Sequence, residues 1–159
     1  MRNKIVPLEA LLDIKGILLH GSFDLLHIGH LRYFTWGKNL HPCHRLIVTL
    51  TADEFFPKYK GECRPAFQQD VRAEWISYID IVDYVSIVDE PTGILAIDTV
   101  KPYVYGKGWE AKGIIPEEVA ATELWGGRVE YMEKECESGQ IFSSGRILSG
   151  EYLKSRSKK

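Results

Sequence analysis

Cysteine is scarce in this chain of 159 residues, and neither sign of charge is in large excess. The three cysteines are an odd number at wide spacings, so they predict neither a disulfide framework nor a metal signature. With 20 basic and 22 acidic residues the net charge is −2, which argues against a general nucleic-acid-binding surface. No apolar run is long enough to cross a bilayer, and Pro7 and Glu9 interrupt the first apolar stretch, which makes it a poor signal peptide. We therefore expect a cytoplasmic protein that acts on a small molecule, with no nucleic-acid or membrane partner.

Internal repeats and low-complexity linkers are also absent, so a single domain is expected over residues 1–150. Leu8, Leu11 and Leu12 have helical spacing after a proline, which predicts an N-terminal helical extension within residues 1–15. The basic stretch at residues 151–159 is expected to be a flexible, solvated tail.

Short apolar runs alternate with helical patterns along the chain. The expected strands are residues 16–20, 46–50, 84–88, 102–105 and 128–132, and the expected helices are residues 28–39, 66–79, 92–99, 116–124 and 143–148. This alternation predicts an α/β fold with a parallel five-stranded sheet and flanking helices. In such sheets ligands bind beyond the carboxyl ends of the strands, so the loops 20–30, 51–64 and 105–112 should surround one site.

The loop after the first expected strand carries Gly-Ser-Phe-Asp-Leu-Leu-His-Ile-Gly-His, residues 21–30. His27 and His30 are three residues apart, so they share a face if a helix begins here, beside free N–H groups that favour anions. Gly21 permits close backbone approach to a ligand, and at Gly29 a bulky side chain would block a phosphate. Such imidazoles suit a phosphoryl group that gains charge during transfer. The alternatives are two ordinary polar residues near a helix start, or a zinc site, for which no third ligand has suitable spacing.

This stretch resembles the Gly-x-Phe-Asp-x-x-His-x-Gly-His signature of the cytidylyltransferase-like nucleotidyltransferases. Over residues 17–148 the chain is most similar to the adenylyltransferase domain of bifunctional ADP-heptose synthase. That similarity includes Thr51-Ala52-Asp53, Gly61-Glu62-Cys63-Arg64-Pro65, Arg72, Lys101-Pro102, Gly106-Lys107-Gly108, Gly126-Gly127 and Phe142-Ser143-Ser144.

The resemblance implies a Rossmann-like, doubly wound fold and a nucleotidyltransferase that joins ATP to a phosphorylated small molecule, releases pyrophosphate and uses Mg²⁺. It also implies a homodimer, to which Trp75 and Tyr78 would contribute an apolar patch, and a separate protein for any sugar kinase step. The catalytic candidates are His27, His30 and Lys60. The nucleotide-binding candidates are Gly21, Ser22, Phe23, His27, Gly29, His30, Gly106, Lys107, Gly108, Ser143 and Ser144. No metal-ligating side chain is assigned.

Four further residues are weaker candidates for contact with substrate or phosphate: Arg64, Arg72, Trp109 and Arg146. Arg64 either orients phosphate or braces the following helix. Arg72 is either an exposed helical charge or, as the resemblance implies, a ligand contact. Trp109 either stacks on a base or packs in the core.

Other polar residues also keep two interpretations. Lys58 and Lys60 are either solvated or a mobile counter-charge for the triphosphate, and the resemblance favours Lys60. Ser143 and Ser144 either bind phosphates or cap a helix. Asp24 is expected to accept backbone N–H bonds in its own turn, with help in holding Mg²⁺ as the alternative.

Two alternative functions remain. Trp109-Glu110 favours a CTP-dependent enzyme acting on glycerol 3-phosphate or another alcohol phosphate. The stretch 138–143 lacks an arginine that the glycerol- and choline-type enzymes carry, and this absence favours ATP. A nucleotide-binding module without turnover is the other alternative.

Overall fold

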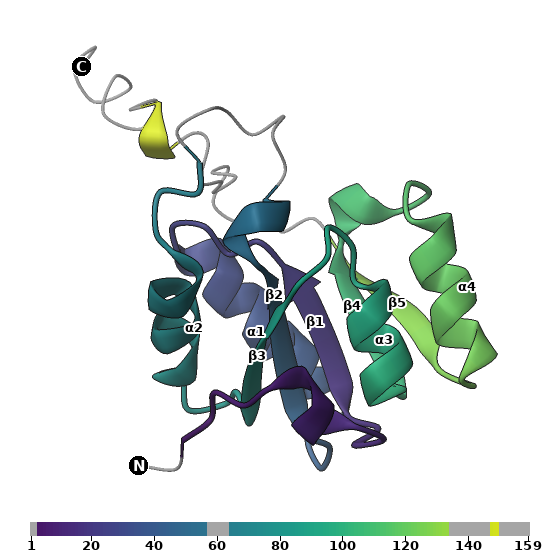
Figure 1. Cartoon of the computed structure of the whole chain (residues 1–159). Coiled ribbons are helices and arrows are strands. Elements are labelled where there is room, and N and C mark those ends of the chain that lie inside the picture. Colours follow the sequence, from purple (N-terminus) through teal and green to yellow (C-terminus); the bar gives the residue numbers. More distant parts are fainter. Residues whose placement is uncertain (1–2, 57–63, 134–146, 150–159) are drawn as a thin grey trace.

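The computed structural model describes residues 3–56, 64–133 and 147–149. Its centre is a sheet of five parallel strands: β1 (Ile17–Gly21), β2 (Leu46–Thr51), β3 (Tyr84–Val88), β4 (Val104–Gly108) and β5 (Arg128–Met132). The strands occur in the order β3-β2-β1-β4-β5 (Figure 1). The chain winds outward from β1 to β3 and then crosses back to β4, so the switch point lies between β1 and β4. Ligands of doubly wound sheets bind at the carboxyl edge of this point.

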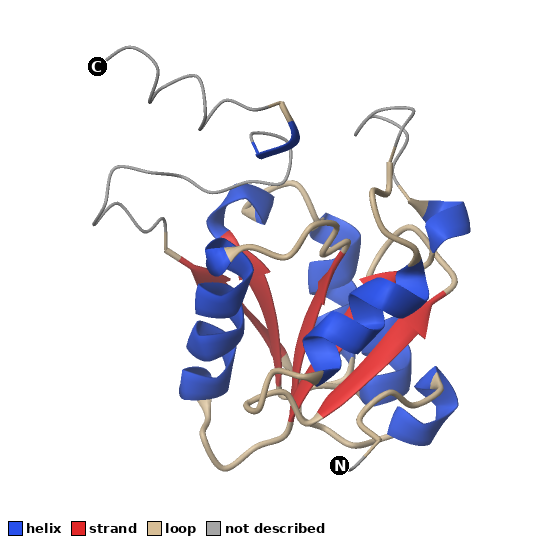
Figure 2. Ribbon diagram, turned by 90° about the vertical axis from the view of Figure 1, so that its left-hand side faces the viewer, coloured by secondary structure: helices blue, strands red, loops and turns tan. Residues whose placement is uncertain are grey.

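Helices cover both faces of the sheet, as the turned view in Figure 2 shows. The helices are α1 (Ile28–Leu40), α2 (Gln69–Ser77), α3 (Ile94–Val100) and α4 (Pro116–Leu124), with short 3-10 helices η1 (Leu8–Leu11), η2 (Asp53–Phe55) and η4 (Trp109–Ala111). Leu19 of β1 points toward α1 and α2, where it joins Phe34 and Ile76 in one core cluster. The neighbouring Leu18 points the other way, toward Ile97 of α3. Successive residues of β1 therefore point into two separate cores, because the side chains of a pleated strand alternate between the two faces of the sheet.

The predicted fold class is confirmed, and three elements have the predicted boundaries: β3, α4 and β5. The N-terminal helical extension is shorter than expected, because only the 3-10 turn η1 forms within residues 7–14. The positive φ angles of Asp13 and Lys15 end it, and both N–H groups bond to the end of α3. β4 begins two residues later than predicted and extends to Gly108. The helix predicted at residues 143–148 lies almost wholly outside the described residues.

Candidate active site

The turn after β1 has an unusual backbone. Phe23 and Leu25 both have positive φ angles, 46° and 64°, which few non-glycine residues adopt. The Phe23 ring is buried and packs edge-on against Phe34 of α1. A Cβ atom at Gly21 would lie 3.1 Å from this ring. Gly21 therefore makes room for Phe23, whereas the sequence had suggested room for a ligand.

His27 and His30 come together at the start of α1. His27 is the N-cap residue, and its Nδ1 accepts the Gly29 N–H at 3.1 Å. Because Nδ1 is the acceptor, the neutral ring carries its proton on Nε2, which is left as a donor. The two rings stack with centroids 3.8 Å apart, and Phe23 meets His30 edge-on at 5.3 Å. Partial burial lowers the pKa of His27, so its ring is neutral near pH 7.

The Gly29 N–H is thus used in the cap, and fewer free N–H groups remain at this helix start than the sequence had suggested. The predicted pairing of the two imidazoles is nevertheless present. It lies at the carboxyl end of β1, beside the switch point. The arrangement offers side-chain donors to an anion at the edge of the sheet.

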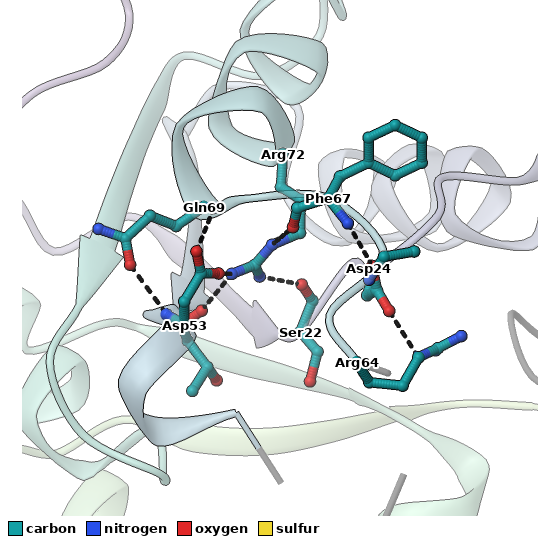
Figure 3. A network of polar contacts seen from close by, with 9 residues as sticks. Ser22, Asp24, Asp53, Arg64, Phe67, Gln69 and Arg72 are labelled. Carbon is teal, nitrogen blue, oxygen red and sulfur yellow. Dashed lines mark hydrogen bonds and ion pairs between the residues drawn. The ribbon is translucent and has the colours of Figure 1, made fainter. Parts of the chain in front are cut away.

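A polar network joins the signature turn to the start of α2 (Figure 3). The Asp24 carboxylate is buried; its Oδ1 accepts the N–H groups of Ala66 (2.8 Å) and Phe67 (3.3 Å), and its Oδ2 lies 2.6 Å from Arg64 Nε. Asp24 therefore accepts backbone N–H bonds as expected, but from a segment 42 residues away and not from its own turn. The helix α2 begins at Gln69 and not at the predicted residue 66, because the preceding Gln68 is extended, with φ −58° and ψ 153°.

Arg72 of α2 is fully buried and bonded entirely within the protein. Its Nε donates to Phe67 O at 3.0 Å and its Nη1 to Ser22 O at 2.5 Å. Its Nη2 donates to Thr51 O at 2.9 Å and to Asp53 Oδ1 at 2.6 Å. Neither an exposed helical charge nor a ligand contact, the two alternatives that the sequence had left, agrees with this burial. Arg72 instead braces the ends of β1 and β2 against α2.

The carboxyl end of β4 is tightly packed against side chains of β1 and α1. A Cβ atom at Gly106 would lie 2.5 Å from Leu19 and 2.9 Å from Trp36, so only glycine fits there. The Tyr33 hydroxyl of α1 donates to Gly106 O at 2.5 Å. Burial, followed by nearby carboxylates, raises the pKa of Tyr33 well above 10, which keeps this hydroxyl protonated. The β4 end and α1 are therefore held together across the switch point.

The residues that follow Gly106 lie at the carboxyl end of β4 and at the start of η4. The Lys107 ammonium lies 3.3 Å from Glu118 Oε2 of α4 and donates to the Tyr105 hydroxyl at 3.2 Å. Gly108 allows the Glu110 carboxylate to lie close to the backbone, because an added Cβ would collide with it. The Trp109 side chain is 45% exposed at the start of η4, outside the two buried cores. Its ring is accessible for stacking.

A buried imidazole that the sequence analysis did not single out lies on the α3 face of β1. His20 Nδ1 is 3.0 Å from the Thr49 hydroxyl, and its Nε2 is 3.3 Å from the Thr51 hydroxyl. Burial, with a smaller effect from Lys107, lowers the pKa of His20 to about 3. One signal was available: positions 20, 49 and 51 are polar residues at the ends of otherwise apolar strands. His20 links β1 to β2 directly behind the signature turn.

Comparison with known proteins now places this geometry in a family. The family model described as cytidylyltransferase-like matches residues 18–134, which is most of the chain. This chain belongs to the cytidylyltransferase-like family. The matched region contains both histidines, the Asp24 and Arg72 network and the end of β4. The family places the domain among the nucleotidyltransferases.

Curated relatives agree with this placement, and a solved structure shares the fold. The bifunctional protein HldE of Geobacter metallireducens is 36% identical over 130 residues, covering 80% of this chain and 26% of that protein. HldE of Campylobacter concisus is 38% identical over 126 residues, covering 77% and 26%. The chain thus spans about a quarter of the length of these curated relatives. The lipopolysaccharide core biosynthesis protein from Thermoplasma volcanium shares the fold, with a TM-score of 0.64, 24% identity and coverage of 75% of this chain and 96% of that one.

Several candidate residues of this cytidylyltransferase-like domain lie outside the described part of the chain: Lys58, Lys60, Ser143, Ser144 and Arg146.

Within the residues that the structure describes, no group of three or more His, Cys, Asp or Glu side chains could hold a metal ion. No helix among the described residues is long and apolar enough to span a membrane.

Proposed function

We propose that this domain transfers the adenylyl group of ATP to a phosphorylated small molecule, a heptose-like sugar phosphate, and releases pyrophosphate. The stacked His27–His30 pair at the switch point is the observation that carries the proposal. The resemblance to the adenylyltransferase domain of ADP-heptose synthase and the relatives named HldE support the choice of nucleotide and acceptor.

The reaction needs no covalent enzyme intermediate. The acceptor phosphate attacks the α-phosphorus of ATP in line, the new P–O bond forms as the bond to the β-phosphate oxygen breaks, and pyrophosphate leaves. His27, through Nε2–H, and His30 donate hydrogen bonds to the α-phosphate oxygens as their charge grows. Lys60, Ser143 and Ser144 hold the β- and γ-phosphates in this proposal. Positioning and charge neutralisation then supply the catalysis.

Mg²⁺ fits this scheme as a partner of the phosphates. Both oxygens of Asp24 contact the segment 64–67, and Arg72 and Gln69 engage the oxygens of Asp53. Mg²⁺ keeps several waters and needs few protein carboxylates. The nucleotide's own oxygens would therefore carry the ion, and its charge would assist the departure of pyrophosphate.

The Trp109-Glu110 pair, which lies at the end of β4 with Trp109 exposed, keeps a CTP-dependent reaction with an alcohol phosphate as a second candidate. Binding titrations with ATP and with CTP separate the two. If CTP binds and ATP does not, the adenylyl assignment is wrong while nucleotidyl transfer remains.

We also propose a homodimer. Tyr78 is 61% exposed at the end of α2, and Trp75 of the same helix packs at a tilt against the partly exposed Phe67. Any sugar kinase step would come from a different domain or protein. Light scattering on the purified chain tests the dimer, and a monomer at micromolar concentration would refute it.

The decisive experiment measures pyrophosphate release with ATP or CTP and a panel of phosphorylated acceptors. The variant His30→Ala should lower kcat by about 10²- to 10³-fold, because one transition-state donor is lost. His41→Ala is the matched control, since His41 is exposed at the far end of the same helix. Folded His30→Ala protein with wild-type turnover would refute the assignment. Clear nucleotide binding without turnover on any acceptor would instead favour the non-catalytic alternative.

A further inference from the structure

Two arginines, Arg64 before α2 and Arg72 within it, are used in different ways. Every side-chain nitrogen of Arg72 donates within the protein. Arg64, by contrast, contacts the described part of the chain through Nε, which lies 2.6 Å from Asp24 Oδ2. Figure 3 shows the end of its guanidinium pointing away from that carboxylate.

The ion pair with Asp24 holds the Arg64 guanidinium beside the signature turn. The Asp24 side chain is 1% exposed, and the Ala66 and Phe67 N–H groups hold it on its other oxygen. The Arg64 side chain is only 10% exposed, so it has little freedom to rotate. A guanidinium held at Nε presents its two Nη groups as a fork, and that fork matches two oxygens of a phosphate.

Asp24 ties Arg64 to the turn that also carries the histidines. Asp24 belongs to the same turn as His27, three residues earlier, and that turn leaves β1 at the carboxyl edge of the sheet. Arg64 therefore adds a positive charge at the edge where the proposed reaction takes place.

We infer that Asp24 is a positioning residue that holds Arg64, so that the Nη groups of Arg64 bind a phosphate group of a substrate. This inference rests on the proposed function. The phosphate belongs either to the triphosphate of the nucleotide or to the acceptor, and both offer the same paired oxygens.

Calorimetric titrations of the full chain test the inference. ATP and inorganic pyrophosphate probe the triphosphate position. Mannose 1-phosphate, added to protein saturated with a non-hydrolysable ATP analogue, probes the acceptor position. The variants are Arg64→Lys, Asp24→Asn and the double variant. Arg45→Lys is the matched control, because Arg45 also pairs with an aspartate, Asp83, but at the opposite end of β2.

Arg64→Lys keeps the charge and one bond to Asp24 but loses the fork. We expect one probe to bind roughly tenfold more weakly to it, as the loss of a charge-assisted hydrogen bond predicts, while its unfolding temperature and the Arg45→Lys control stay near wild type. The probe that weakens identifies the phosphate. Asp24→Asn should weaken the same probe and should have no further effect on binding in the Arg64→Lys background, because it acts through Arg64.

Unchanged binding of all probes to Arg64→Lys would overturn the inference. So would additive losses in the double variant, because they would show that Asp24 acts on binding by another route. Wild-type protein that binds none of the probes would overturn both the inference and the proposed function. Weaker pyrophosphate binding by Arg64→Lys, together with no turnover on any acceptor, would overturn the proposed function alone.

Discussion

Arg72→Met should unfold far more easily than wild type without a direct effect on nucleotide contact. Methionine fills much of the arginine volume but makes none of its hydrogen bonds. The change leaves the carbonyls of Ser22, Thr51 and Phe67 and the carboxylate of Asp53 without this donor.

The size of the effect follows from burial. Arg72 is 0% exposed, and breaking a buried pair by removing one partner typically costs about 3–5 kcal/mol. The Asp53 side chain is 34% exposed and regains some water, which lowers the cost, while the carbonyls left without this donor offset that gain. A loss of about 4 kcal/mol is expected, which lowers Tm by about 10 °C in a domain of this size.

Urea unfolding followed by circular dichroism measures this loss. Arg128→Met is the matched control: Arg128 is 58% exposed and pairs with the exposed Glu130, so its removal should cost less than about 1 kcal/mol. A stable Arg72→Met protein that has lost ATP affinity would refute the bracing role and restore the ligand contact that the sequence had suggested.

Two further predictions concern the strand ends. The unfolded chain protonates His20 near pH 6.5 whereas the native state resists protonation until about pH 3. The stability from this group is therefore complete above pH 6.5 and is lost as the pH falls toward 3. Urea titrations between pH 7 and 4 should show that the free energy of unfolding of His20→Gln falls less steeply with pH than that of wild type. An equally steep fall in both proteins would contradict this. Gly106→Ala should destabilise the fold by about 1–3 kcal/mol, because its Cβ collides with Leu19 and Trp36, and an unchanged unfolding midpoint would show that the β4 end can move away.

Local signals predicted much of the fold. Pro116 at the first helical position and the glycine pair at 126–127 mark both ends of α4, so its boundaries follow from the sequence alone. The start of α2 could not be predicted in this way. Residues 66 and 67 have helical spacing with the rest of α2, but Gln68 is extended, and Asp24 binds residues 66 and 67 from a distant part of the chain.

The candidate site, like the fold, could be predicted from the sequence only in part. The signature stretch predicted where the histidines lie, because its residues are contiguous and follow a strand. The partners of Gly21, Asp24 and Arg72 are set by tertiary packing, and no local pattern reveals them. Ser22, predicted as a nucleotide contact, uses its carbonyl to accept a bond from Arg72, so this part of the turn serves the fold.

These contacts couple the signature turn to a helix that is remote in sequence. The turn holds two non-glycine residues, Phe23 and Leu25, in the left-handed region, a conformation that costs free energy unless its surroundings impose it. Arg72 supports it from the α2 side, through its bond to Ser22 O. Since His27 follows Leu25 by two residues, we expect the stacked position of the histidine pair to depend on the docking of α2. Substitutions that loosen α2 should therefore reduce activity even where they touch no ligand, and the loss should follow the population of the docked state.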